Sequence, residues 1–366
     1  MSDDASASGS PSEHVVADSS APPTGTIDRR KQVVAGLITL VVLVIVFAGV
    51  FPKFANYSDA WASIQQMSLA SDLALLAVTV INIVIYVFPY MAALPGIRFP
   101  DAFVVRQTSF MISNTVPAGG AFGLGVQYAM LSGYGFGPAE ASSAIAVTSV
   151  WNLLVTLALP ALGLMVLLVL GDATSNQIVG AIGGLIAIVA IVGAMVVVLR
   201  SESWARRIGG WGDAVVHRFR PSSAPDVVTA GVVRFREQTY DVVARRWRSL
   251  TVTNFAQQFS QFFVLLVAIY GLGGRSSGVN PAEVFAAFAI ARLAGFIPVT
   301  PGGLGTVDAA LVGLLSAFGM DKNEALAADL LWRAATFIPQ VVIGIITFLI
   351  WRVQAARRAR SAATST

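Results

Sequence analysis

The stretch Pro298-Val299-Thr300-Pro301-Gly302-Gly303-Leu304-Gly305-Thr306-Val307-Asp308 decides how this chain folds. Its two prolines and three glycines separate two short apolar segments, residues 280–296 and 304–318. Proline lacks a backbone donor, and glycine lacks the side chain that would restrict a turn. Because unpaired backbone groups are costly in hydrocarbon, such a break survives only where protein or a water-filled cavity surrounds it. The stretch therefore predicts the tip of a broken hairpin buried in a membrane.

Composition supports a membrane setting for the whole chain. Of the 366 residues, 55% are hydrophobic and 12% are charged, whereas soluble domains contain about 25% charged residues. Several apolar runs exceed the roughly 18 residues that indicate a spanning helix. There is no cysteine, and the only histidines are His14 and His217, so no disulfide, thiolate, metal site or cofactor is expected. The fold class predicted is an all-α polytopic membrane protein.

The apolar runs divide into full spans and shorter pieces. The predicted spans are residues 33–51, 69–93, 140–170, 178–199, 251–272 and 326–351. A second pair of short pieces, 102–116 and 122–134, surrounds the break Pro117-Ala118-Gly119-Gly120. Pieces of about 13–17 residues cover about 20–25 Å, less than a hydrocarbon core of ~30 Å. We therefore expect six spans and two re-entrant hairpins. If the two pieces of each pair instead crossed the membrane fully, the count of basic residues on each side would be the same, so charge does not distinguish the two arrangements.

The basic residues predict the orientation, because Lys and Arg concentrate in cytoplasmic loops. With the N-terminus inside, only Lys53, Arg275 and Lys322 fall outside, and Arg98 and Arg106 are among the residues counted inside. Both termini are then cytoplasmic. The first hairpin enters from the cytoplasm and the second from the opposite side. This arrangement is typical of an inverted repeat, which places substrate near the membrane midplane.

Three parts of the chain are predicted. Residues 1–28 are acidic and polar and form a disordered cytoplasmic tail. Residues 29–351 form the transmembrane domain, and residues 352–366 form a basic cytoplasmic tail. Within the domain, residues 200–248 hold ten arginines and five acidic residues, with interleaved tryptophans. We interpret this segment as a basic cytoplasmic loop with interfacial helices on anionic lipid rather than as a nucleic-acid site.

Charged side chains near the second break are the main site candidates. Arg292 and Arg333 lie in apolar segments, where a charge costs about 2.5–3.5 kcal/mol and usually faces a cavity or a partner. Asp329 lies one turn before Arg333. Asp308 opens the helix after the glycines, where the helix dipole favours a carboxylate. One interpretation is a structural ion pair between Asp308 and either arginine.

The other interpretation is an anion site. Guanidinium groups bind phosphate with bidentate geometry, and helix N-termini direct amides at anions. Both interpretations hold if the ion pair opens to admit a phosphate. The residues expected to bind a lipid phosphate are Arg292, Arg333, Asp308, Pro301, Gly302, Gly303 and Gly305.

Polar residues elsewhere could line a path for a headgroup. Four amides recur at helical spacing on one face, where lipid would force them inward; they are Asn254, Gln257, Gln258 and Gln261. Hydrogen bonds between helices are the alternative role for this stripe. The first hairpin tip contributes Asn114, Pro117, Gly119, Gly120 and Gln127. Because that tip lacks strong charges, we place a single anion site at the second hairpin.

The opening motif resembles that of a known family. The stretch from Pro301 to Asp308 is similar to the Pro-Gly-Gly-Leu-Gly-x-x-Glu pattern of the lysylphosphatidylglycerol synthase transmembrane-region family, with Asp308 in place of the usual Glu. Arg333 and Pro339 match an arginine and a proline of that family's last span. In the first half Asn114, the proline and the glycine pair match, while Gln127 stands near an expected arginine. The resemblance covers roughly residues 33–351.

This resemblance implies a flippase-like protein of a bacterial inner membrane that translocates or handles anionic or glycosylated lipid. The family's aminoacyl-transfer domain is not expected after Trp351, and no catalytic constellation or nucleotide motif appears, so an enzyme is not expected. One alternative is a non-transporting subunit that presents lipid to a separate glycosyl- or aminoacyl-transferase. Another is a lipid-modifying enzyme. Expected partners are membrane lipids, such a transferase and a second copy of the chain.

Overall fold

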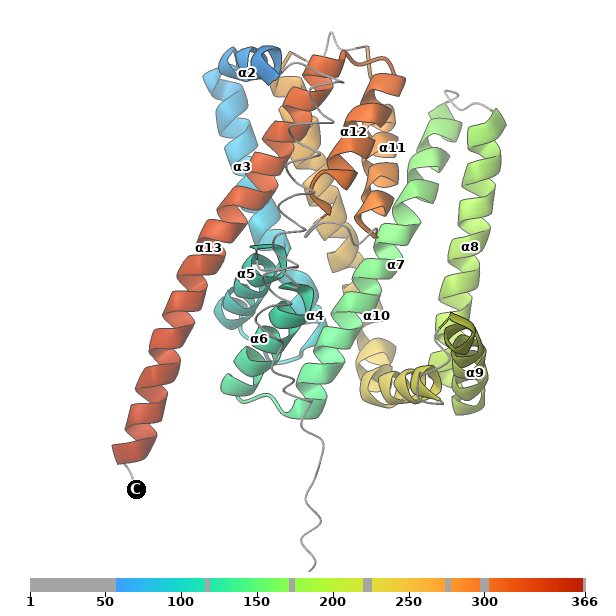
Figure 1. The fold of residues 1–366 in the computed structure, drawn as a ribbon, viewed down its shortest axis with the longest axis vertical. Coiled ribbons are helices and arrows are strands. Elements are labelled where there is room, and N and C mark those ends of the chain that lie inside the picture. Colours follow the sequence, from blue (N-terminus) through green and yellow to red (C-terminus); the bar gives the residue numbers. More distant parts are fainter. Residues whose placement is uncertain are drawn as a thin grey trace, which may run out of the picture.

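The computed structural model describes residues 57–115, 119–170, 175–219, 226–273, 278–296 and 303–364. These residues form a tall bundle of helices (Figure 1). The predicted all-α class is confirmed for this part of the chain. The predicted first span, 33–51, and the acidic tail lie outside it.

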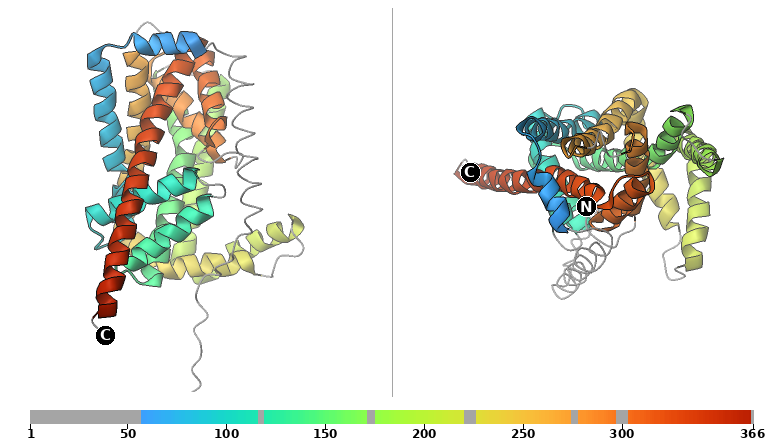
Figure 2. Two further views of the ribbon diagram at one scale, coloured as in Figure 1. Left: turned by 60° about the vertical axis from the view of Figure 1, so that its left-hand side comes forward. Right: turned by 90° about the horizontal axis from the view of Figure 1, so that it is seen from above.

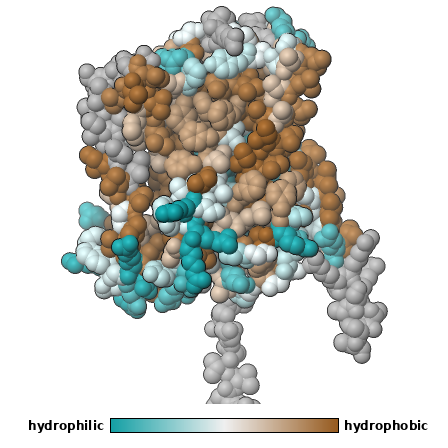
Figure 3. Space-filling model, turned by 180° about the vertical axis from the view of Figure 1, so that it is seen from behind, coloured by the Kyte–Doolittle hydropathy of each residue, from teal (hydrophilic) through white to brown (hydrophobic). Residues whose placement is uncertain are grey.

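Four helices among the described residues are long and apolar enough to cross a bilayer. They are Leu69–Ala93, Pro138–Leu170, Thr239–Gly271 and Lys322–Ala355. Another predicted span, 178–199, falls within helix α8 (Ser175–Arg200). Figure 3 shows apolar side chains over most of one face, with hydrophilic side chains gathered toward the lower end. The prediction of a polytopic helical membrane protein is confirmed at this level.

The span at 69–93 is broken, which the sequence analysis did not expect. It consists of α3 (Leu69–Ile85) and α4 (Phe88–Ala93). Pro89 accounts for the break, because a proline ring clashes with the carbonyl four residues earlier, here that of Ile85. The interruption places Tyr86 at the end of α3, where its side chain is buried.

The short apolar pieces form two pairs of helices in opposite halves of the molecule. In the first pair α5 (Phe99–Thr115) packs against α6 (Gly119–Gly133). In the second, α11 (Pro281–Ala291) and the 3-10 turn η3 (Arg292–Phe296) pack against α12 (Thr306–Ala317). The first pair lies in the lower half and the second in the upper half (Figures 1 and 2). Residues 116–118 and 297–302, which contain most of both breaks, lie outside the described residues.

The basic segment is helical. It forms α9 (Glu202–Phe219) and the first part of α10 (Val227–Gly271), which continues without a break into the span predicted from Thr251. Asp213 of α9 accepts hydrogen bonds from the amides of Val228 (2.8 Å) and Thr229 (3.1 Å), and so caps α10. Figure 1 shows α9 and the start of α10 lying across the lower end of the bundle.

The last helix, α13 (Lys322–Thr364), also extends past its predicted end at 351. Alanine and arginine, which dominate residues 355–363, have high helix propensity and supply no stop signal. Gly344 allows α13 to approach α5 closely, because a Cβ there would lie 2.4 Å from the Cβ of Met111. Small residues therefore set the spacing of this contact.

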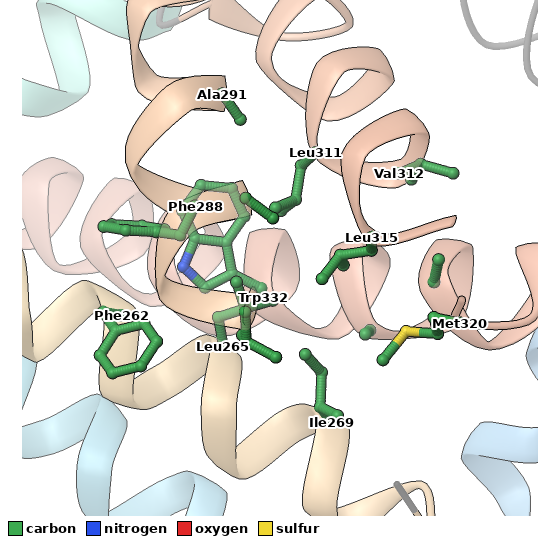
Figure 4. Close-up of a cluster of buried hydrophobic side chains, with 14 of the residues drawn as sticks. Phe262, Leu265, Ile269, Phe288, Ala291, Leu311, Val312, Leu315, Met320 and Trp332 are labelled. Carbon is green, nitrogen blue, oxygen red and sulfur yellow. The ribbon is translucent and has the colours of Figure 1, made fainter. Parts of the chain in front are cut away.

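A core of buried side chains joins α10, α11, α12 and α13 (Figure 4). Trp332 of α13 lies at its centre, with its ring edge-on to Phe288 at a centroid distance of 6.0 Å. The indole Nε1 of Trp332 donates to the carbonyl of Gln261 (3.1 Å). A buried tryptophan held by packing and a hydrogen bond fixes the rotation of α13. This rotation positions the next residue, Arg333.

Candidate functional site

Asp308 and Arg333 form an ion pair in the interior. Asp308 lies in the first turn of α12 and is fully buried, and the side chain of Arg333 is 15% exposed. The guanidinium Nε of Arg333 donates to Oδ1 of Asp308, and the amide of Gly305 donates to Oδ2. Both carboxylate oxygens are therefore satisfied. Of the two arginines that the sequence analysis considered for Asp308, the structure pairs it with Arg333.

The glycines before α12 shape the loop that this pair holds. Gly303 and Gly305 have φ angles of +67° and +86°, in the region that side-chain-bearing residues rarely adopt. The carbonyl of Gly303 accepts from the hydroxyl of Thr306 (3.2 Å) and lies 3.5 Å from Nη2 of Arg333. Arg333 therefore contacts both ends of the loop. Two other predicted site residues, Pro301 and Gly302, lie outside the described residues.

Arg292 lies within electrostatic reach of Arg333 and has no carboxylate partner among the described residues. It opens η3 and is half-buried. Its Nε has no hydrogen-bond partner among the described residues. Its guanidinium lies 5.9 Å from the ring centroid of Phe288 and within electrostatic reach of Arg333 and Tyr86. The structure thus brings two predicted arginines together but pairs only one of them.

Asp329 is a buried carboxylate to which the sequence analysis assigned no role. It is 1% exposed and lies one turn before Arg333 on α13. Asp308 and Arg333 are the charged groups that act on it, and neither of its oxygens has a hydrogen-bond donor among the described residues. The sequence placed Asp329 one turn before Arg333 but gave no sign that its side chain is buried.

Arg106 is a buried charge on α5 of the first hairpin, outside the tip residues 114–127. The sequence analysis counted it among the cytoplasmic residues, but on α5 it is only 7% exposed. Its guanidinium lies over the rings of Tyr86 (4.5 Å) and Phe110 (4.7 Å), and Nη2 donates to Oε1 of Gln340 (3.1 Å). Two aromatic faces and the side-chain oxygen of Gln340 therefore contact this cation in the interior. No pattern of spacing in the sequence indicated these partners.

The first hairpin tip serves packing at the positions the structure describes. Asn114 donates to the carbonyl of Phe110 within its own helix (2.8 Å). A Cβ at Gly119 would lie 2.3 Å from the carbonyl oxygen of Ile112, so this glycine permits the close turn. Gly120 is exposed with open space around it. Pro117 lies outside the described residues.

The amide stripe of α10 forms hydrogen bonds between helices. Gln257 and Gln258 both donate to Oδ1 of Asn152 on α7 (3.2 Å each), and Gln258 also donates to the hydroxyl of Thr156 (3.1 Å). Asn254 donates to a carbonyl of its own helix, that of Leu250 (2.8 Å). These bonds agree with the interhelical role.

Some acceptors of the stripe remain unused. Among the described residues no donor reaches the side-chain oxygens of Asn254, Gln258 and Gln261. These three oxygens are buried acceptors that a polar ligand could satisfy. A lining role for the stripe therefore stays a prediction.

Comparison with known families decides where the chain belongs. The model of the lysylphosphatidylglycerol synthase TM region family matches residues 32–344. The chain belongs to this family. The resemblance at Pro301–Asp308 and Arg333 is thereby confirmed at the level of the family. A search of curated proteins gives no match.

Tyr86 links the charged groups of the two halves in this family member. Its phenol lies within electrostatic reach of both Arg106 and Arg292, and it interacts with Gln257 of the amide stripe. Gln127, the buried residue near which the family has an arginine, interacts with the neighbouring Tyr90. Tyr86 therefore feels the charge of an arginine from each hairpin, Arg106 of the first and Arg292 of the second.

Proposed function

We propose that this member of the lysylphosphatidylglycerol synthase TM region family translocates anionic or glycosylated lipid between the leaflets of a bacterial inner membrane. The observation that supports this is the half-buried Arg333, paired with Asp308 beside the guanidinium of Arg292, which has no carboxylate partner among the described residues. Intramembrane charges usually serve a substrate or ion path. We also propose that the chain acts without catalysing a chemical step.

The headgroup phosphate replaces Asp308 as the partner of Arg333 in this mechanism. A guanidinium presents parallel N–H groups that match two phosphate oxygens. Arg292 supplies a second positive group next to it, and the ion pair closes the site when no lipid is bound. The amides of the glycine loop at the start of α12 favour an anion at the same place.

The membrane arrangement follows from the distribution of charge. Figure 1 shows α9, the start of α10 and the C-terminal end of α13 at one end of the molecule, and these segments hold most of the described arginines. Placing this end in the cytoplasm satisfies the positive-inside rule. The α5–α6 pair is then a re-entrant hairpin from the cytoplasm, and α11–α12 is one from the opposite side. Such an inverted arrangement places the arginine site near the membrane midplane.

Translocation of fluorescent phosphatidylglycerol in proteoliposomes tests the site. We expect Arg333→Ala and Asp308→Asn to reduce the rate at least about tenfold, which corresponds to one lost interaction of about 1.4 kcal/mol. Arg352→Ala, a change of the same kind on the exposed lower part of α13, should keep the wild-type rate. Wild-type rates in both site variants would refute the assignment.

A presenting role is the alternative outcome. If the pure wild-type protein moves no lipid but co-purifies with a glycosyl- or aminoacyl-transferase and bound lipid, the chain is a non-transporting subunit. Turnover of lipid by the pure protein would instead identify an enzyme.

A further inference from the structure

An apolar cavity of about 720 Å³ lies apart from the central arginines, between α7, α8 and α10. Its volume falls within the range of about 300–1,000 Å³ typical of ligand sites. The wall on α7 includes Trp151 and Ala158, and the wall on α8 runs from Val192 to Arg200. Val192 and Val196 are 41% and 40% exposed. The cavity is therefore reachable from the lipid that surrounds the bundle.

The two ends of the cavity differ in chemistry. Since α7 and α8 are antiparallel neighbours (Figure 1), Ala158 and Val192 lie at the upper end, with Phe255 of α10. Arg200, at the end of α8, and Tyr240, near the start of α10, lie at the lower end. The eight helical steps from Val192 to Arg200 correspond to about 12 Å along the helix axis. The cavity is therefore an apolar slot that ends at the guanidinium of Arg200 and the phenol of Tyr240.

Arg200 has no carboxylate partner among the described residues. The ion pairs found there are Arg98–Asp101, Arg206–Glu202 and Arg333–Asp308. Glu202, the acid closest to Arg200 in sequence, accepts from Arg206 at 2.8 Å. The hydrogen bond and charge of Arg206 lower the pKa of Glu202, so this carboxylate is ionised and engaged elsewhere. Within the described part of the chain, the exposed guanidinium of Arg200 thus has no carboxylate partner.

We propose that this cavity binds an anionic phospholipid of the leaflet on the basic side, with one acyl chain in the slot and the phosphate on Arg200. An acyl chain suits the lining because it brings no polar group that would need a partner, whereas a peptide would bring unpaired amides. Trp247 and Tyr240 are half-exposed at the lower end, where amphipathic rings suit the level of lipid headgroups. The arginines of α9 and α10 add attraction for anionic lipid.

This lipid site is separate from the proposed headgroup site at Arg333. Arg292, Asp308 and Arg333 are not among the residues that line the slot. The Trp151 indole in its wall donates to the hydroxyl of Thr251 (3.1 Å), which also lines the slot. Binding in the slot can therefore be measured whether or not the protein translocates lipid.

Native mass spectrometry of the full chain in detergent, titrated with phosphatidylglycerol or phosphatidylethanolamine, tests the site. We expect one phosphatidylglycerol to remain bound at collision energies that remove phosphatidylethanolamine. Arg200→Gln should weaken its binding about tenfold, as expected for one charge-assisted contact. Arg218→Gln, the same charge change at an exposed position of α9 outside the slot, should leave binding unchanged. Ala158→Phe should fill the upper end and weaken binding, and Leu153→Phe on the lipid-facing side of α7 should not.

Two results would overturn the proposal. Equal losses in Arg200→Gln and Arg218→Gln would show that only the overall basic charge attracts lipid. Equal binding in Ala158→Phe and Leu153→Phe would show annular lipid only. If Arg200→Gln itself unfolds the protein, the Ala158→Phe comparison still decides whether the slot holds a chain.

Discussion

Arg333 donates to Asp308 across 25 positions of sequence, and the carboxylate it binds is inaccessible to solvent. The pair joins α13 to the first turn of α12. It also holds the glycine loop, since Gly305 donates to the same carboxylate. Removing one partner of a buried ion pair is costly, because the other charge is left uncompensated. In the proposed mechanism a lipid phosphate takes the place of the carboxylate, so that Arg333 keeps an anionic partner.

Replacing Asp308 should destabilise the protein far more than replacing Asp329. Asp308→Asn takes the carboxylate to which it donates away from Arg333, whose side chain is only 15% exposed, and we expect this to cost about 3 kcal/mol. Asp329→Asn keeps the volume of a carboxylate that has no donor among the described residues. Its stability should be unchanged or higher. Thermal unfolding in detergent micelles measures both, and an equal loss in the two variants would contradict the asymmetry.

Arg106 should not tolerate lysine. Arg106→Lys loses the planar stack on Tyr86 and Phe110 and the bond to Gln340, which we expect to cost about 1–2 kcal/mol of stability. Arg98→Lys is the matched control, because the Arg98 side chain is 79% exposed in its pair with Asp101 and such pairs contribute little. A thermal unfolding midpoint of Arg106→Lys equal to that of Arg98→Lys would refute a buried role.

The contact between α5 and α13 should depend on Gly344. A methyl group there would meet Met111 at 2.4 Å and the carbonyl of Gln107 at 2.6 Å. Since a backbone atom cannot move as a side chain can, Gly344→Ala should cost about 1–3 kcal/mol. Gly313→Ala, in α12 with nothing within 4 Å, should be neutral or stabilising by up to about 1 kcal/mol. If the thermal unfolding curves of the two alanine variants coincide, α5 and α13 separate easily enough to accommodate the extra methyl group.

The junction of α9 and α10 should weaken in acid. The hydroxyl of Thr229 and the amides of Val228 and Thr229 donate to Asp213, and these bonds lower the pKa of its carboxyl group. A lowered pKa in the folded state gives stability that is present above the ordinary value of about 3.9. That stability is lost as the pH falls through the lower folded value.

Hydrogen exchange of residues 226–231 at neutral and acid pH measures this effect. Thr229→Val should expose these amides more than in the wild type at neutral pH, and the difference should shrink once Asp213 is protonated. Thr253→Val, whose hydroxyl donates to carbonyls of its own helix, should show no such pH dependence. A difference between wild type and Thr229→Val that persists in acid would mean that packing, not the carboxylate, caps α10.

Much of the helical arrangement was predictable, and much of the polar interior was not. The length of the apolar runs predicted the spans at 69–93, 140–170, 178–199, 251–272 and 326–351, and proline and glycine predicted both breaks. The amides of α10 were placed on one face by their spacing alone. Arg106 was counted among the cytoplasmic basic residues and Asp329 was given no role, because a charge in sequence shows neither its depth nor its partner. The kink before Pro89 was passed over because apolar content dominated that segment.

The sequence by itself determined that this is a helical membrane protein with two interrupted hairpins, because hydrophobic length and the backbone limits of proline and glycine are local properties. Only the tertiary structure decided that Asp308 pairs with Arg333 rather than with Arg292. It alone placed Arg106 between Tyr86, Phe110 and Gln340, a residue 234 positions away. The reason is that such pairings depend on the rotation and depth of each helix. Close packing at residues such as Gly344 and Trp332 sets both.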